Sequence, residues 1–482
     1  MSVLENLEPK LVWKHFEEIT KIPRCSKHEE KIRDYIVNFA KKQKLPMKTD
    51  HVGNVVISKP ATQGIKNKPT IILQGHMDMV CEKNSDVVFD FSKDPIKLKR
   101  NGDLLTADGT TLGADNGIGL AISLAILEDT TIKHGPIEAL FTVDEETGLT
   151  GAFAMKPDFI TGEIMLNLDS EDFGVITVGC AGGGDSKIDL PITMQSPLVD
   201  MQGLMVKVSG LRGGHSGVDI HEQRGNAIKL LARILWEASQ HYTFHISDMK
   251  GGDKHNAIPR EAYVTLTLKK TDKTKFIADL KIEGKNILDE IKPIDPNFKV
   301  DVEETAKPQK VVDSSSQKKL LSLVYGLPHG VHQMNYDIKT LVETSTNLAT
   351  IAFKDNTVVI GMSSRSPVKS ELQDMRDRIH AIASLAGATV TEQTPYPGWK
   401  PNLSSKILAL SKKIFKEMYN QEAKVEAIHA GLETGIIGEK FPGMDMISIG
   451  PTLKYPHSPE EQLHISTVPK FYKYVLKILE NV

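Results

Sequence analysis

Short apolar runs that alternate with a helical pattern dominate the first part of the chain. Four runs have the composition of buried strands, and the helical pattern at 118–127 lies between two of them. The runs are 54–57, 70–73, 137–143 and 163–168. Strands that alternate with helices predict a layered α/β domain, with a mostly parallel sheet flanked by helices.

The pattern changes after the glycine cluster at 182–184. The strand-like segments that follow, such as 204–208 and 262–268, alternate apolar and polar residues, as strands with one exposed face do. We therefore expect a large inserted α+β domain over 186–398. Its strand, loop, helix order occurs twice, which suggests an internal duplication. Residues 1–185 and 399–482 would then form the two parts of the first domain.

Composition excludes several classes of function. The 482 residues include 59 Lys and Arg against 62 Asp and Glu, a net charge of −3 that offers no broad surface for nucleic acid. No apolar run approaches the roughly 18 residues that a membrane-spanning helix needs. The first residues lack the basic and apolar regions of a secretion signal. The three scattered cysteines, Cys25, Cys81 and Cys180, predict a reducing cytoplasmic location without a disulfide framework.

The segment TIILQGHMDMV is an apolar run that ends in His76 and Asp78. Side chains two positions apart in a strand share one face, so the imidazole and the carboxylate would point the same way. This pattern is typical of a metal-ligating histidine that a nearby acid orients. A surface histidine beside an aspartate is an equally good interpretation of this segment alone.

Further nitrogen and oxygen ligands follow other elements of the predicted sheet. Asp115 precedes the apolar helical run in GADNGIG, where helix capping is the ordinary alternative. Glu145 and Glu146 follow a buried run in DEETG, where the alternative is a solvated acidic loop; if both converge on a metal, one would ligate it and the other would accept a proton from its water. Asp169 ends another apolar run in GEIMLNLDSED, and His457 lies in a Pro-rich loop that precedes a possible helix. This thiolate-free set suits Zn, Mn or Co at an open catalytic site.

Eight motifs, in chain order, resemble those of the aminoacyl-histidine dipeptidases, also called cytosolic nonspecific dipeptidases. The motifs are HMD, GADNGIG, DEETG, NLDSEDFG, GLRGGHSG, HNAIPR, HAGLETG and PHSPEEQ. These enzymes belong to the dinuclear zinc exopeptidases that include carboxypeptidase G. The resemblance extends to about residue 470. It implies that 1–185 and 399–482 form a catalytic domain and that 186–398 is its lid.

The resemblance also implies two divalent metal ions per chain, with Zn²⁺ first and Co²⁺ or Mn²⁺ as alternatives. Five ligands would hold them: the bridging Asp115, His76 and Asp169 on one ion, and Glu146 and His457 on the other. Asp78 would orient the first histidine. Glu145 would be the general base that takes the proton of the bridging water and passes it to the leaving amine. Two such ions, about 3.5–4 Å apart, lower the pKa of that water and polarise the scissile carbonyl.

The lid would supply substrate contacts. By resemblance, His215 in LRGGHSG would hydrogen-bond the developing oxyanion, although a glycine-rich turn with an incidental histidine is the alternative. Asn256 and Arg365 would hold the C-terminal carboxylate of the substrate. The turn at Gly431 would close the pocket floor, and Glu433 would lie nearby in a role left open. The long insertion favours a site complete in one subunit, with a homodimer left open.

The predicted function is a metallo-dipeptidase that hydrolyses unblocked dipeptides, preferentially Xaa-His such as β-alanyl-histidine. Small peptides are the expected partners, with neither nucleic acid nor membrane. The alternative is another amide hydrolase on the same scaffold, an N-acyl amino acid deacylase or a tripeptidase, since a fold does not determine a substrate. A non-catalytic binder is disfavoured, because a binder has no use for Glu145 beside a ligand.

Overall fold

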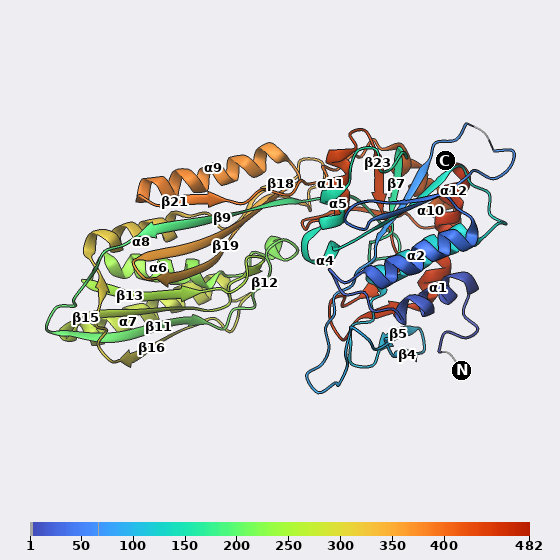
Figure 1. Cartoon of the computed structure of the whole chain (residues 1–482). Coiled ribbons are helices and arrows are strands. Elements are labelled where there is room, and N and C mark those ends of the chain that lie inside the picture. The colour runs from blue at the N-terminus through green and yellow to red at the C-terminus, as the bar shows by residue number, and fades with distance from the viewer. Residues whose placement is uncertain (1–2, 66) are drawn as a thin grey trace. The chain divides into compact units, whose positions relative to one another are not determined.

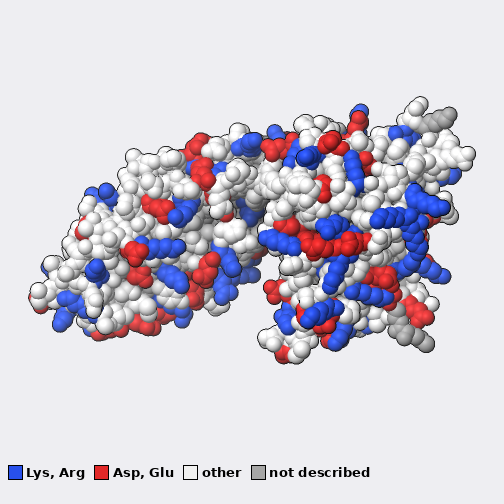
Figure 2. Space-filling view, viewed as in Figure 1, with Lys and Arg blue, Asp and Glu red and all other residues white. Residues whose placement is uncertain are grey.

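The computed structural model describes residues 3–65 and 67–482, which form two compact units (Figure 1). Unit 1 comprises Met1–Cys180, Trp399–Ala427 and Leu432–Val482, and unit 2 comprises Ala181–Gly398 and Ile428–Gly431. Each unit has its own apolar core. The face of the molecule seen in Figure 2 carries basic and acidic side chains interspersed over both units.

The centre of unit 1 is an eight-stranded sheet of order β1-β2-β6-β3-β7-β23-β8-β22. In that order the strands are β1 (Met47–Thr49), β2 (Val55–Lys59), β6 (Ile137–Thr142), β3 (Ile71–His76), β7 (Ile164–Asn167), β23 (Asp445–Ser448), β8 (Val175–Cys180) and β22 (Lys424–Ile428). The strands β6, β3, β7 and β23 are parallel, whereas β1, β2 and β8 pair antiparallel. The predicted α/β fold is confirmed, with its parallel strands confined to the middle of a mixed sheet.

Helices complete unit 1. They are α1 (Lys10–Thr20), α2 (Glu30–Gln43), α3 (Ala114–Glu128), α4 (Glu145–Gly148), α5 (Thr150–Ala154), α10 (Lys406–Tyr419), α11 (Glu433–Lys440) and α12 (Val468–Asn481). Helix α3 is apolar around its whole circumference, and it is buried between α1 and β3 accordingly. A second, four-stranded sheet joins β24 (Leu453–Lys454), β25 (Gln462–His464), β5 (Leu104–Ala107) and β4 (Leu98–Asn101).

Unit 2 is built on a nine-stranded sheet whose pairings are antiparallel. Its order is β16 (Lys299–Thr305), β11 (Met201–Ser209), β15 (Ala262–Lys269), β13 (Phe244–Gly251), β19 (Val342–Lys354), β20 (Thr357–Ser366), β9 (Gly182–Pro191) and β21 (Thr389–Glu392), with β18 (Gly330–Met334) also paired to β19. The helices α6 (Ala227–Ser239), α7 (Lys273–Ile291), α8 (Ser314–Gly326) and α9 (Lys369–Ala386) share its core. Two short strands, β12 (Gly214–His215) and β14 (Ala257–Ile258), pair separately.

One prediction about the cysteines is wrong. Cys25 and Cys81 form a disulfide, with their Cα atoms 5.7 Å apart, whereas Cys180 is a buried free thiol. The two partners are 56 residues apart in the chain, and they meet because Cys25 forms a parallel bridge with Met79. Spacing along the sequence does not reveal such a tertiary contact. Among the described helices, none combines the length and hydrophobicity needed to span a bilayer.

Candidate metal centre

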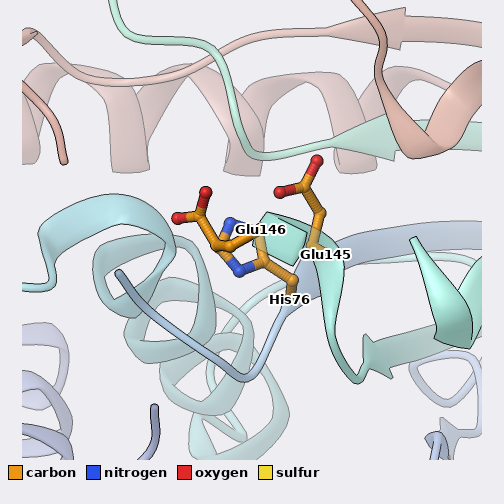
Figure 3. A group of neighbouring side chains, drawn as sticks. All are labelled: His76, Glu145 and Glu146. Atoms are coloured by element: carbon orange, nitrogen blue, oxygen red, sulfur yellow. The ribbon is translucent and has the colours of Figure 1, made fainter. Parts of the chain in front are cut away.

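The carboxyl ends of the parallel strands bring the first ligand candidates together. His76 is the last residue of β3 and lies in register with Thr142, the last residue of β6. The carboxylates of Glu145 and Glu146 follow β6 at the start of α4, and Asp169 follows β7 on the other side of β3. Figure 3 shows the two glutamates pointing in different directions from adjacent positions beside the imidazole. Ligand sites in open α/β sheets lie at this end of the strands.

Asp115, at the start of α3, lies between two groups of side chains. Its Oδ1 is 3.1 Å from Nε2 of His76, and its Oδ2 is 3.1 Å from Nε2 of His457. On the first side, Asp169 Oδ1 is 3.3 Å from the His76 nitrogen. On the second side, Glu146 Oε2 is 3.0 Å from the His457 nitrogen. The five side chains therefore form two triads, each with its ligand atoms within 4.8 Å of one another, and the triads share Asp115.

These residues fit a pair of divalent ions. Glu146 Oε1 is buried without a hydrogen-bond partner among the described residues. A buried carboxylate oxygen left unpaired is costly, so such an atom points to a missing cation or donor. Two imidazoles and three carboxylates, without a thiolate, are the ligands that zinc and similar divalent ions accept at catalytic sites.

The charges in the cluster are consistent with that fit. Burial raises the pKa of Asp169 to about 6, and neighbouring carboxylates add to the rise. Burial likewise raises the pKa of Glu145 well above its usual value, with Asp169 and Glu146 contributing. Hydrogen bonds to Asp115 and Glu146 raise the pKa of His457 to about 11. The carboxylates thus outnumber the positive charges around them, and a divalent cation would relieve their mutual repulsion.

Asp78 supports the ligands without joining either triad. Its fully buried carboxylate accepts a hydrogen bond from Nδ1 of His76 at 3.2 Å, which turns Nε2 toward the cluster. It also accepts from the backbone N–H groups of Glu145 at 3.1 Å and Glu146 at 3.2 Å, and from Ser26 Oγ at 2.8 Å. Burial opposes ionisation, but these hydrogen bonds lower the pKa of Asp78 to about 2. It therefore stays charged and fixes both the imidazole and the α4 backbone.

Two supporting residues have no assigned role in the sequence analysis. Arg24 is 2% exposed and donates to the carbonyls of Met77 at 3.0 Å, Asp78 at 2.6 Å and Gly113. It lies in a segment whose pattern indicates only a turn. Glu461 belongs to the PHSPEEQ motif, yet nothing in the motif shows that its carboxylate is buried. In the tertiary structure Glu461 accepts hydrogen bonds from the backbone of 112–115. Neither its contacts nor those of Arg24 follow from the local sequence.

The other predicted site residues lie in unit 2. His215 pairs with Ala257 across β12 and β14, beside Asn256, whose carbonyl accepts from Ser216 N at 2.8 Å. The His215 Nδ1 accepts from the N–H groups of Gly217 at 3.2 Å and Val218 at 3.0 Å. Because Nδ1 is an acceptor, the neutral ring carries its proton on Nε2. Burial and the Arg365 charge lower the pKa of His215 to about 4, which keeps the ring neutral.

Arg365 is at the end of β20 and is 6% exposed. Its Nη1 donates to the Tyr396 hydroxyl at 2.9 Å, while its Nε has no hydrogen-bond partner among the described residues. A Cβ on Gly431 would be 3.0 Å from the Tyr396 ring, so the turn at 428–431 packs closely beside the same tyrosine. Unit 2 therefore groups a buried cation and a neutral histidine donor.

A carboxylate and histidine cluster at the carboxyl ends of parallel strands is typical of the metal-dependent hydrolases as a class. The chain matches the model of Peptidase family M20/M25/M40 over residues 72–481 and belongs to that family. The predicted enzyme class, a metallopeptidase, is confirmed by this membership.

Individual relatives are consistent with this family membership. The chain is 38% identical to the cytosol non-specific dipeptidase of Escherichia coli over 483 residues, which cover 100% of this chain and 99% of the relative. Its structure matches the crystal structure of aminoacylhistidine dipeptidase from Vibrio alginolyticus with a TM-score of 0.93 and 40% identity, covering 100% and 98% of the two chains. A Staphylococcus aureus tripeptidase, 17% identical with a TM-score of 0.57 and 98% coverage of both chains, shares the fold. The resemblance to aminoacyl-histidine dipeptidases is confirmed.

Proposed function

We propose that this protein is a dinuclear zinc dipeptidase that hydrolyses unblocked dipeptides, preferentially Xaa-His such as β-alanyl-histidine. The observation that carries the proposal is the pair of ligand triads that share Asp115. The names of the Escherichia coli and Vibrio alginolyticus relatives support the substrate class. The donor set is equally compatible with Co²⁺ or Mn²⁺.

The five ligand candidates would hold the two ions. His76 and Asp169 would bind one ion, Glu146 and His457 the other, and Asp115 both. When bound, such ions supply Lewis acidity that polarises the scissile carbonyl and lowers the pKa of a water molecule. Asp78 would keep the first imidazole oriented throughout, because it is buried and ionised.

Glu145 is the general base and acid of the proposed reaction. It belongs to neither triad that shares Asp115, yet its carboxylate lies within 4.8 Å of ligand atoms of His76 and Glu146. Burial and neighbouring carboxylates raise its pKa above the usual value, and a carboxyl group in hydrogen-bond reach of a metal-bound water can act as its base. It would take a proton from the attacking water and deliver it to the leaving amine nitrogen.

Substrate recognition is assigned to residues of unit 2. The Nε2–H of His215 is a neutral donor suited to an oxyanion, since its Nδ1 is already occupied as an acceptor. The Nε of the buried Arg365 guanidinium has no hydrogen-bond partner within the described part of the chain, and such a donor suits the C-terminal carboxylate of a dipeptide. Asn256 would bind the same carboxylate, and Gly431 would leave space beside it.

The test is hydrolysis of β-alanyl-histidine by protein stripped with a chelator, before and after zinc is restored. We expect no activity without metal and recovery with it. The matched substrate is N-acetyl-β-alanyl-histidine, which lacks the free amine and should be cleaved poorly. Preferential cleavage of the acetylated compound or of tripeptides would contradict the proposal and favour the deacylase or tripeptidase alternative. Folded protein that cleaves none of these substrates with Zn²⁺, Co²⁺ or Mn²⁺ would refute it.

We also propose a cytoplasmic location, which the name of the Escherichia coli relative supports. Fractionation of cells that produce the protein would check it, because recovery with secreted or membrane fractions would contradict the proposal. Small peptides remain the proposed partners, and a homodimer remains a prediction that light scattering would test.

A further inference from the structure

The carboxylate of Glu461 accepts four backbone hydrogen bonds from a single stretch of chain. Its Oε2 accepts from the N–H groups of Leu112 at 2.7 Å and Gly113 at 2.9 Å. Its Oε1 accepts from Ala114 at 2.8 Å and Asp115 at 3.2 Å. Glu461 is only 2% exposed, so its carboxylate makes hydrogen bonds to the backbone rather than to solvent.

This stretch is the N-terminus of α3, where Asp115 lies. The first N–H groups of a helix have no partner within the helix, and they carry partial positive charge. Helix α3 has no side-chain cap of its own: its N-cap residue is Gly113, with φ of 67°, and Asp115 has non-helical backbone angles. Glu461, from a segment far along the chain, therefore takes the place of the missing cap.

Arg24, which has the opposite charge to Glu461, binds the same stretch of chain. Its guanidinium donates to the carbonyl of Gly113, the residue whose N–H group donates to Glu461. Both charged side chains are 2% exposed. The backbone that leads into Asp115 is thus fixed through its N–H groups by a buried anion and through a carbonyl by a buried cation.

Glu461 is also close in sequence to another ligand candidate. The connection between β24 and β25 contains both His457 and Glu461, and the strands close it by pairing Leu453 with Leu463. His457 itself is half-exposed, with 52% of its side chain accessible. Its Nε2 lies 3.1 Å from Asp115 Oδ2. The buried Glu461 carboxylate therefore connects the loop that carries His457 to the backbone of Asp115.

We propose that Glu461 is a positioning residue that fixes the position of His457 relative to Asp115. It thereby raises the affinity for a divalent ion at the site that these two residues share with Glu146. The inference rests on the metal centre under Proposed function. Residues that orient metal ligands commonly contribute about 10- to 100-fold to metal affinity. Glu461 does so for two ligands on separate segments.

The decisive variant is Glu461→Gln. Glutamine keeps the length and volume but has one acceptor oxygen, and its NH₂ group would face two of the four N–H groups. We expect the ion held by Asp115, Glu146 and His457 to bind about 10- to 100-fold more weakly. Competition with a chromophoric chelator would measure its affinity. With Co²⁺, the visible spectrum should lose the contribution of that ion. The exposed neighbour Glu460 provides the matched control, and Glu460→Gln should bind both ions as the unmodified protein does.

Thermal unfolding in excess chelator separates positioning from a purely structural role. A variant that unfolds earlier in chelator yet binds both ions with unchanged affinity and an unchanged Co²⁺ spectrum would overturn the inference. If Glu461→Gln does not fold, Glu461→Asp decides, since it keeps the charge and shortens the reach by one methylene. We expect the same loss for it, of smaller size, and wild-type affinity would overturn the proposal. Unmodified protein that binds no second ion would instead refute the metal centre itself.

Discussion

In the oxidised protein, the Cys25–Cys81 disulfide should contribute measurably to the free energy of unfolding of unit 1. It closes a loop of 56 residues. In the chain-entropy model, a loop of this length removes about 14 cal/mol/K from the unfolded state, or about 4 kcal/mol at 25 °C. For a unit of this size, that free energy corresponds to a decrease in Tm of about 8–16 °C when the bond is absent.

The bond also lies beside the residues that support the ligands. Met79 N donates to Arg24 O at 3.1 Å, and Ser26 Oγ donates to Asp78 at 2.8 Å, so the residues on both sides of Cys25 contact the segment that ends at Cys81. Loss of the bond should therefore lower the affinity for metal as well as the free energy of unfolding.

Thiol titration and thermal unfolding test this reasoning. Protein unfolded without reductant should show one reactive thiol per chain, that of Cys180, and three after reduction. Cys25→Ser should lower Tm to the value of the reduced protein, and reductant should then have no further effect. Cys180→Ser is the control, because its Tm should still fall on reduction. Three thiols before reduction, or a Tm that reduction leaves unchanged, would refute the argument.

Four further predictions concern single side chains. Glu145→Gln should keep its bound metal, checked by elemental analysis, and lose about 10²- to 10⁴-fold in kcat, because the variant cannot accept a proton; retained turnover would exclude Glu145 as the base. Asp115→Ala should contain fewer than about two ions per chain, and an unchanged stoichiometry would contradict a bridging role. His215→Ala should lower kcat more than it raises KM if His215 stabilises the transition state, whereas the reverse pattern would make it a substrate binder. Burial lowers the pKa of His429 from 6.5 to about 3. Below pH 6.5 the unfolded chain therefore protonates His429, whereas the folded chain does not. The free energy of unfolding decreases as the pH falls, by about 2 kcal/mol at pH 5. Denaturant titrations at pH 7.5 and 5.0 should show a smaller difference for His429→Gln than for the unmodified protein, and equal differences would count against this cause.

The sequence carries information on the parts of the fold that local patterns determine. The apolar run at 70–73 overlaps the start of β3, and the helical pattern at 118–127 lies within α3, because burial imposes a period on each element. The order of elements then places the ends of β3, β6 and β7 side by side. For this reason the candidates on those ends could be proposed together before the structure was known.

Other features depend on contacts between distant segments. Three features have no local signature, since each depends on a partner far along the chain. They are the antiparallel pairings of β2 with β6 and of β8 with β23, the Cys25–Cys81 bond and the buried Arg24. Glu461 is the clearest example. A glutamate in a polar loop is ordinarily exposed, and only four backbone donors from 112–115 make its burial favourable.

The junction of the inserted segment has a consequence for how such proteins diversify. Cys180 and Trp399, on either side of the insertion, exchange backbone hydrogen bonds of 2.9 Å in both directions. The chain therefore leaves and re-enters unit 1 at adjacent positions, and the entropy of closing that gap depends only weakly on how many residues lie between. All five ligand candidates lie outside the insertion. Selection could thus lengthen, shorten or replace the inserted segment while the five ligand candidates are inherited unchanged.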